Sequence, residues 1–390
     1  MSDMASYQKL RKKQKLNTKQ ANQRIAEVAV TVDETTALPQ DDPRGPDCGI
    51  TWSDRRFQPL NLYPRLKPNQ KPSPADIETA QQLARKLIYY FDHGKVALLD
   101  KKNNLKVIAL IEFTPLERLS ELERAELNTV ATFLNGAKDF VNKINCPSRS
   151  WGGNMRMVGW RKGMESLELL GRYRDQDAID NAQDKYDKLM RESSTSSDIL
   201  GRIFKRFANV AFQDNRELMA KDYIPAHAAL DFDAPLKPDD CASNLSFTRD
   251  DFYNPPHSDK GDISEFAFGL FFPISRADGK LAMGCNPDNV SGGSFVFPNY
   301  RCGIDFSKQN GVVKMVWRAK DYEHCTLPPG EAKANMRAGI SLQINQKTAS
   351  AARDSKSGAI YSRPANIGKD RTKMYMGNHN SHLNPPNRNP

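Results

Sequence analysis

The sequence has no long apolar run and no dense group of cysteines. No apolar stretch approaches the roughly 20 residues that a membrane-spanning helix requires. The Lys/Arg-rich N-terminus is not followed by the apolar core of a secretory signal. The six cysteines are scattered, so the sequence predicts neither a cysteine-rich zinc site nor a disulfide framework. We therefore expect a protein of a reducing intracellular compartment, with no membrane partner.

Positive charge is concentrated at the two ends of the chain. Residues 1–24 carry seven basic residues against one acid, and residues 345–390 carry eight against two. Because the formal net charge is +10, the body between these ends is close to neutral. Two cationic arms favour a polyanion such as DNA as the partner; a solvated or nuclear-targeting tail is the other interpretation. We expect a nuclear protein.

Apolar periodicity and turn residues divide the chain into parts. Residues 1–72 are predicted to form a basic, largely disordered arm and linker, because a basic stretch is followed by Pro/Asp-rich sequence. Residues 73–227 are predicted to form a helical support region with a β-hairpin, beginning at the helix-start signals near Ser73. Residues 348–390 are polar and apolar-poor, and we expect a basic, loosely ordered tail.

Short apolar runs recur between residues 228 and 347, with Gly, Pro, Asn or Asp between most of them. Such spacing is typical of an antiparallel double-sheet barrel, the jelly roll. The expected strands lie at 228–232, 244–247, 265–274, 293–297, 312–317 and 340–344. We therefore predict an α+β protein in which a double-stranded β-helix (jelly-roll) catalytic core is braced by N-terminal helices.

One of the six histidines, His257, stands two residues before Asp259 at the entrance to a predicted strand. Residues two apart in an extended chain point to the same side, so this imidazole and carboxylate can meet at one point. His324 follows 65 residues after Asp259. Two histidines and one carboxylate occupy one face of an octahedral iron and leave the other face open. The pattern predicts an Fe(II) site, and the alternative for each residue is a turn or a buried structural role.

Arg337 lies thirteen residues after His324, at the entrance to the predicted strand 340–344. A guanidinium pairs bidentately with carboxylates, so Arg337 suits the far carboxylate of 2-oxoglutarate, with a surface cation as the alternative. The order of these residues favours a dioxygenase that uses Fe(II) and 2-oxoglutarate.

Residues 150–347 resemble the Tet/JBP-like nucleic-acid dioxygenases, particularly a fungal branch of them. The resemblance rests on His257-Ser-Asp259 leading into Phe266-Ala-Phe-Gly-Leu-Phe-Phe272, on Gly292-Gly-Ser-Phe-Val-Phe-Pro298, and on His324-Cys-Thr-Leu-Pro328 followed by Ile340-Ser-Leu342. It implies oxidation of a methylated base in DNA, either 5-methylcytosine or N6-methyladenine, and the second reaction would be a demethylation. Animal members carry a cysteine-rich zinc-binding region, which this chain lacks.

The chain departs from its relatives at the residue for 2-oxoglutarate. In relatives an arginine directly precedes the Ile-Ser start of the strand, and here Gly339 holds that place. Arg337 lies two residues earlier on the same face of the strand, so it can substitute for that arginine. Ser341, on the same face, is a further candidate for the same carboxylate.

The resemblance also indicates residues for the base. A polar residue three positions after the Asp ligand helps to hold the base in relatives, and Asp262 stands there, with a turn residue as the alternative. Tyr253 and Asn254 would stack on or bond to a flipped base, or else pack the loop. Arg161 belongs to the segment 149–162, which either grips phosphates or opens the catalytic unit as a core strand.

Two other functions fit the same residues. An oxygenase acting on protein or a small molecule would keep the iron ligands but would not require basic flanks. A catalytically inactive DNA-binding relative would keep the strands and both basic ends, and the intact candidate ligands argue against it. The sequence therefore predicts, as the partner, duplex DNA with a flipped methylated base.

Overall fold

The computed structural model describes residues 50–53, 59–67, 69–100, 103, 106–283, 287–306 and 311–382 of the 390-residue chain. Most of the predicted basic arm, and the last residues of the predicted tail, lie outside the described residues. In the part of the chain that is described, no helix is both long enough and apolar enough to cross a membrane.

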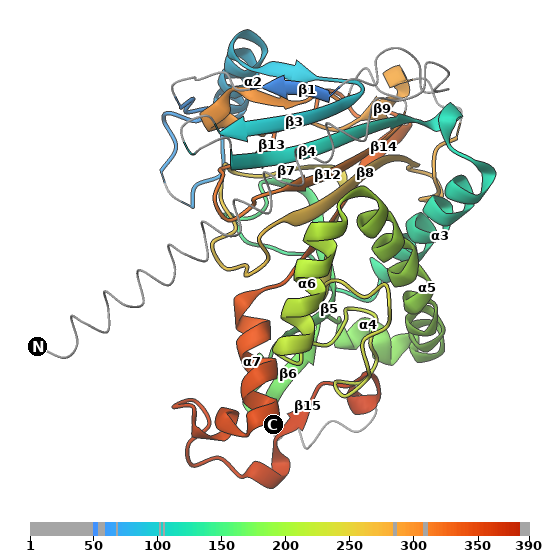
Figure 1. Ribbon diagram of the computed structural model, residues 1–390, viewed down its shortest axis with the longest axis vertical. Helices are drawn as coiled ribbons and strands as arrows, with labels where there is room; N and C mark the ends of the chain where they lie inside the picture. Colours follow the sequence, from blue (N-terminus) through green and yellow to red (C-terminus); the bar gives the residue numbers. More distant parts are fainter. Residues whose placement is uncertain are drawn as a thin grey trace, which may run out of the picture.

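Two β-sheets form the centre of the molecule (Figure 1). Among the described residues, the larger sheet has eleven strands and the smaller one has four. In order across the larger sheet, the strands are β1 (Ile50–Ser53), β3 (Lys95–Asp100), β4 (Lys106–Pro115), β12 (Gly311–Trp317), β8 (Ala267–Ser275), β14 (Asn335–Gln343), β7 (Asn244–Tyr253), β5 (Gly152–Lys162), β6 (Glu168–Arg172) and β15 (Tyr375–Met376), and β9 (Val290–Ser291) pairs with β14. The smaller sheet runs β13 (Cys325–Thr326), β10 (Phe295–Phe297), β11 (Cys302–Ile304) and β2 (Tyr89–Phe91).

Alternate residues of a strand point to opposite sides of the sheet, and β12 buries side chains on both sides. On β12, Val313, Met315 and Trp317 pack into the core between the two sheets. Val312 and Val316, on the same strand, pack into a second core on the helical side. Most strand pairs are antiparallel, so the predicted jelly-roll core is confirmed.

A layer of helices covers one side of the larger sheet (Figure 1). Its members are α3 (Glu121–Ala137), α4 (Gln176–Asn181), α5 (Gln183–Phe207) and α6 (Asn209–Lys221). Phe204 of α5 stacks on Phe268 of β8, with ring centroids 4.6 Å apart, and both side chains are fully buried. The predicted bracing of the barrel by N-terminal helices is therefore confirmed.

The remaining helices lie outside this layer. Among the described residues they are α2 (Pro74–Leu87) and α7 (Gln346–Ser357), together with the 3-10 turns η2 (Leu116–Arg118), η3 (Pro287–Asn289), η4 (Pro298–Tyr300), η5 (Ala359–Ser362), η6 (Arg371–Lys373) and η7 (His379–His382). Ser73 caps α2 with a reciprocal capping box to Asp76, as the helix-start signal predicts.

Strands from the predicted support region belong to the barrel sheet. The hairpin β3–β4 continues the larger sheet beyond β12, and β5 pairs with β7. Without β4, the buried strand β12 would be an exposed edge with unpaired backbone groups. One expected strand is wrong: residues 228–232 form turns, not a strand.

The structure also differs from the sequence expectation at both flanks. Leu62 and Tyr63, in the stretch expected to be linker, are buried against α2 and the smaller sheet. In the expected tail, α7 buries Ala349, Ala351 and Ala352, and β15 pairs with β6. These segments pack through isolated leucines and small alanines, so they present no apolar run that a sequence pattern would detect.

We expect Phe204→Ala to lower the free energy of unfolding by about 3–5 kcal/mol, because it removes a fully buried aromatic ring between the helical layer and β8. Leu122→Ala on α3 is the control, since Leu122 is 67% exposed. We expect the control to change the free energy by no more than about 0.5 kcal/mol. Denaturant unfolding followed by circular dichroism measures both, and equal stability of the two variants would contradict this account of the brace.

Candidate metal centre

His257 and His324 are held opposite each other by their own backbones. The N–H of His257 donates to the carbonyl of His324 at 3.0 Å, and the N–H of His324 donates back at 2.9 Å. Asn254 adds a second clamp, since its side-chain oxygen accepts from the backbone N–H of Thr326 at 2.8 Å. The loop before β8 is therefore joined directly to the strand β13 that follows His324.

Asp259 completes a cluster of three possible metal ligands. Its backbone N–H donates to Ala319 at 2.8 Å, which holds the loop against the end of β12. One carboxylate oxygen lies 3.6 Å from Nε2 of His257, and the other lies 3.8 Å from Nε2 of His324. The ligand atoms of all three residues lie within 4.8 Å of one another. The structure thus brings together the three residues predicted to hold the iron.

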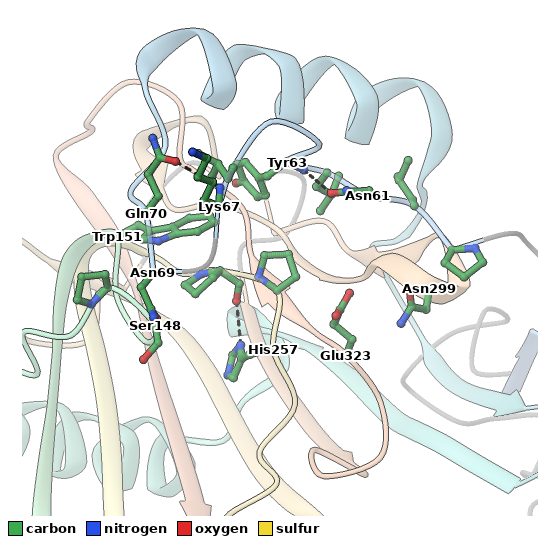
Figure 2. A pocket seen from close by; sticks show the side chains of 17 residues that line it. Asn61, Tyr63, Lys67, Asn69, Gln70, Ser148, Trp151, His257, Asn299 and Glu323 are labelled. Carbon is green, nitrogen blue, oxygen red and sulfur yellow. Dashed lines mark hydrogen bonds between the residues drawn. The ribbon is translucent and has the colours of Figure 1, made fainter.

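Both imidazoles present Nε2 to this cluster. Nδ1 of His257 is 2.9 Å from the carbonyl of Pro255, the contact drawn as a dashed line in Figure 2. Nδ1 of His324 is 3.0 Å from the carbonyl of Tyr322. A carbonyl only accepts hydrogen bonds, so Nδ1 carries the proton and Nε2 keeps a lone pair for a metal.

The surroundings keep His324 neutral. It is buried, Phe295 stacks on its ring at 5.5 Å, and Trp317 meets the ring edge-on at 5.5 Å. Burial, followed by the proximity of His257, lowers the pKa of His324 to about 4. At neutral pH its lone pair is therefore available. Two imidazoles and one carboxylate fit Fe(II), whose protein sites commonly use this donor set.

Gln343 supports the carboxylate ligand. Its side-chain amide donates to Asp259 Oδ2 at 2.7 Å from the end of β14. A hydrogen bond of this kind fixes the orientation of a metal-binding carboxylate. Gln343 is not among the residues predicted from the sequence, although it stands two residues after Ser341 and so shares the face of β14 that was predicted to bind the co-substrate.

The two faces of β14 have different roles. Met336, Ala338, Ile340 and Leu342 pack into the helical-side core, so Arg337, Gly339, Ser341 and Gln343 lie on the opposite face. The guanidinium of Arg337 lies 4.0 Å above the ring of Phe306, and it donates to the carbonyl of Gly293. Burial lowers the pKa of Arg337 to about 9, so it remains a cation at neutral pH.

The packing around Gly339 explains why no arginine stands there. A Cβ at Gly339 would lie 2.7 Å from Oγ1 of Thr248 and 3.1 Å from the ring of Phe271. The ring of Phe271 thus occupies the space in which a longer side chain would start. Arg337 reaches the same face of the strand from a position that is not blocked.

Near the iron ligands, Oγ of Ser341 and Nε1 of Trp317 are buried and have no hydrogen-bond partner among the described residues. Ser341 is paired across the sheet with Gly269, and the ring of Trp317 would lie 3.0 Å from a Cβ added there. The two groups are therefore neighbours. Buried donors without acceptors are rare, and together with Arg337 they fit a dicarboxylate such as 2-oxoglutarate. The sequence analysis missed Trp317.

Asp262, predicted to hold a base, lies directly beside the cluster. Its backbone N–H donates to the carbonyl of Asp259 at 3.0 Å, and its carboxyl group accepts from the Asn345 side chain at 3.5 Å. Burial, then the charge of Asp259, raises the pKa of Asp262 to about 7, and Arg149 and Lys320 act in the opposite direction. Asn345 is a further polar residue here that the sequence analysis missed.

The other predicted substrate residues have different surroundings. The side-chain oxygen of Asn254 is occupied by its bond to Thr326. Tyr253 is half-buried at the end of β7, with its ring over Gly152. Arg161 forms an ion pair with Glu168 at 2.6 Å. It also lies near Tyr173. Asp262 and Arg149 are close enough to Tyr173 for their charges to affect the pKa of its hydroxyl group.

Comparison with solved structures adds little to this geometry. A prolyl-4-hydroxylase from Pseudomonas putida matches with 12% sequence identity and a TM-score of 0.28, over 60% of this chain and 91% of that one. A TM-score this low supports no argument about the substrate. No curated protein matches the sequence.

A family model matches residues 120–329, which is more than half of the chain. Its description is the Tet-like 2OG-Fe(II) oxygenase superfamily. The matched region contains all three clustered ligands, His257, Asp259 and His324. The chain therefore belongs to the Tet-like 2OG-Fe(II) oxygenase superfamily and is an Fe(II)- and 2-oxoglutarate-dependent dioxygenase.

Proposed function

We propose that this dioxygenase oxidises the methyl group of a methylated base in DNA, 5-methylcytosine or N6-methyladenine, in the nucleus. The observation that carries the proposal is the set of groups beside the iron ligands. The carboxyl group of Asp262 and the amide of Asn345 lie together there. The exposed cations Arg149 and Lys320 lie close enough to this carboxyl group for their charges to lower its pKa. An acceptor suits the exocyclic amino group of adenine or cytosine, and cations suit phosphates.

The residues around the centre have separable tasks in this proposal. His257, Asp259 and His324 would hold Fe(II), and Gln343 would keep the carboxylate turned toward it. Arg337, Ser341 and Trp317 would hold 2-oxoglutarate. With both bound, the centre supplies the oxidising chemistry: dioxygen and 2-oxoglutarate are converted to succinate and carbon dioxide, and one oxygen atom enters a C–H bond of the methyl group.

DNA as the substrate is also supported by charge and by resemblance. Both ends of the chain are basic, whereas its body is nearly neutral, and such ends suit phosphate contacts. The resemblance to a fungal branch of the Tet/JBP-like enzymes implies the same substrate. A base in a duplex must leave the stack before its methyl group can reach the centre, and the half-buried ring of Tyr253 is a candidate surface for it.

We expect the purified protein to convert one of the two methylated bases when it is incubated with Fe(II), ascorbate, 2-oxoglutarate and methylated duplex DNA. Nucleoside mass spectrometry measures the product, and succinate release measures turnover. His257→Ala is the control, because it removes an iron ligand. Succinate without any base product would contradict the DNA substrate while leaving the enzyme class intact. A wild type that behaves like the control would contradict the site itself.

We expect Gln343→Leu to weaken Fe(II) binding about tenfold to a hundredfold, because the variant loses the hydrogen bond that orients Asp259. Titration against a competing chelator measures the affinity. Gln213→Leu, on the exposed surface of α6, is the matched control and should bind iron normally. Normal iron affinity in both variants would show that Gln343 has no part in holding the ligand.

We expect Trp317→Phe and Ser341→Ala each to weaken 2-oxoglutarate binding about threefold to tenfold, because one neutral hydrogen bond contributes about 0.5–1.5 kcal/mol. Calorimetric titration of the metal-loaded protein with 2-oxoglutarate measures the affinity. Iron affinity is the internal control, since neither polar atom belongs to the ligand cluster. Unchanged 2-oxoglutarate affinity in both variants would place the co-substrate elsewhere.

A further inference from the structure

A cleft of about 600 Å³ lies next to the metal centre (Figure 2). Its walls come from residues 59–63, 66, 67, 69 and 70, from the turn that leads into β5, from the residues just before Asp259, and from Asn299 and Glu323. His257 forms part of the lining, and its Nδ1 is bonded to the carbonyl of Pro255, which also lines the cleft. The cleft therefore adjoins the metal centre without containing the ligand atoms of Asp259 or His324.

Two side chains of the cleft carry buried polar atoms without hydrogen-bond partners among the described residues. They are the hydroxyl group of Tyr63 and Nε1 of Trp151. Tyr63 is only 6% exposed, and its ring meets that of Trp151 edge-on with centroids 4.7 Å apart. Buried donors without acceptors are rare and destabilising, so two such groups beside one cleft point to a ligand that supplies acceptors.

The amide side chains of the cleft add further donors. Asn61 uses its oxygen to accept from the backbone N–H of Tyr63 at 3.0 Å, and Gln70 uses its oxygen to accept from that of Lys67 at 3.3 Å. The N–H groups of both amides have no partner among the described residues. These two amides therefore add donors to those of Tyr63 and Trp151.

The charge and shape of the cleft narrow the ligand class. Lys67 and Glu323 carry opposite charges, so the lining has no net charge with which to attract a phosphate. Pro59, Pro147 and Pro255 also line the cleft and offer apolar faces to it, as does the indole of Trp151. A planar, uncharged heterocycle with ring nitrogens and carbonyl oxygens matches these features, whereas a peptide backbone brings as many donors as acceptors.

We propose that this cleft binds a second nucleobase of the DNA, one that has left the stack near the base being oxidised. The proposal rests on the proposed function, because it takes DNA to be the substrate. Tyr63 and Trp151 would donate to the acceptors of this base, and the prolines would cover its faces. The cleft would thus set which sequences or structures around the methylated base are accepted.

Abasic substitution separates binding of a base from binding of the backbone. We expect one position near the methylated base, on either strand, at which an abasic nucleotide weakens wild-type binding about threefold to thirtyfold. This is the loss expected when one base no longer stacks and forms hydrogen bonds in the cleft. Fluorescence anisotropy at fixed salt measures the affinity. Equal affinity for every abasic duplex would overturn the cleft proposal. Failure to bind or oxidise even the intact duplex would overturn the proposed function, and this proposal with it.

Variants tie that position to the cleft. Tyr63→Phe keeps the ring and loses the O–H group, and Trp151→Phe replaces the indole with a smaller aromatic ring and loses the N–H group. In both variants we expect intact DNA to bind about threefold to tenfold more weakly. The abasic penalty should shrink in both variants, while Fe(II) and 2-oxoglutarate affinities stay at wild-type values. Tyr223→Phe is the matched control, because Tyr223 is 57% exposed and lies outside the cleft. An abasic penalty that both variants retain in full would assign the base to another site.

Discussion

The reciprocal pair of backbone hydrogen bonds between His257 and His324 is the interaction on which the rest of the site depends. It joins the loop before β8 to the start of β13, and the strands β8 and β13 belong to different sheets. Backbone bonds of this kind do not vary with side-chain rotamers, so the two imidazoles have little freedom to separate. The metal ligands are thus positioned by the closing of the jelly roll itself.

The face of β14 that bears Arg337, Ser341 and Gln343 is oriented by its opposite face. Packing of Met336, Ala338, Ile340 and Leu342 against the helical layer determines which side of the strand faces the centre. A slip by one residue would exchange the two faces, so the helices on the far side of the sheet determine which groups reach the site. The long helices α3 and α5 therefore contribute to function although the clustered ligands lie on neither of them.

The sequence predicts local patterns well and cross-strand relations poorly. Spacing of two residues groups His257 with Asp259, and the same rule groups Arg337 with Ser341. The bond from Gln343 to Asp259 joins residues 84 positions apart, and only the register of the sheet reveals it. The N–H group of Trp317, which has no acceptor among the described residues, is hidden for the same reason, because a missing acceptor is visible only when the neighbours are known. Tyr63 escaped notice because it packs from a segment without periodicity.

The region that marks the family is smaller than the unit that folds. The match ends at residue 329, yet β14, which lies in the middle of the larger sheet, begins at Asn335. The family match begins at residue 120, yet β3 and β4 come earlier in the chain, and β4 pairs with the edge of β12. A fragment cut at the limits of the family match would leave β8 and β12 as open edges and would lack Arg337 and Gln343. For this chain, likeness to a family is therefore a poor guide to where a working enzyme can be divided.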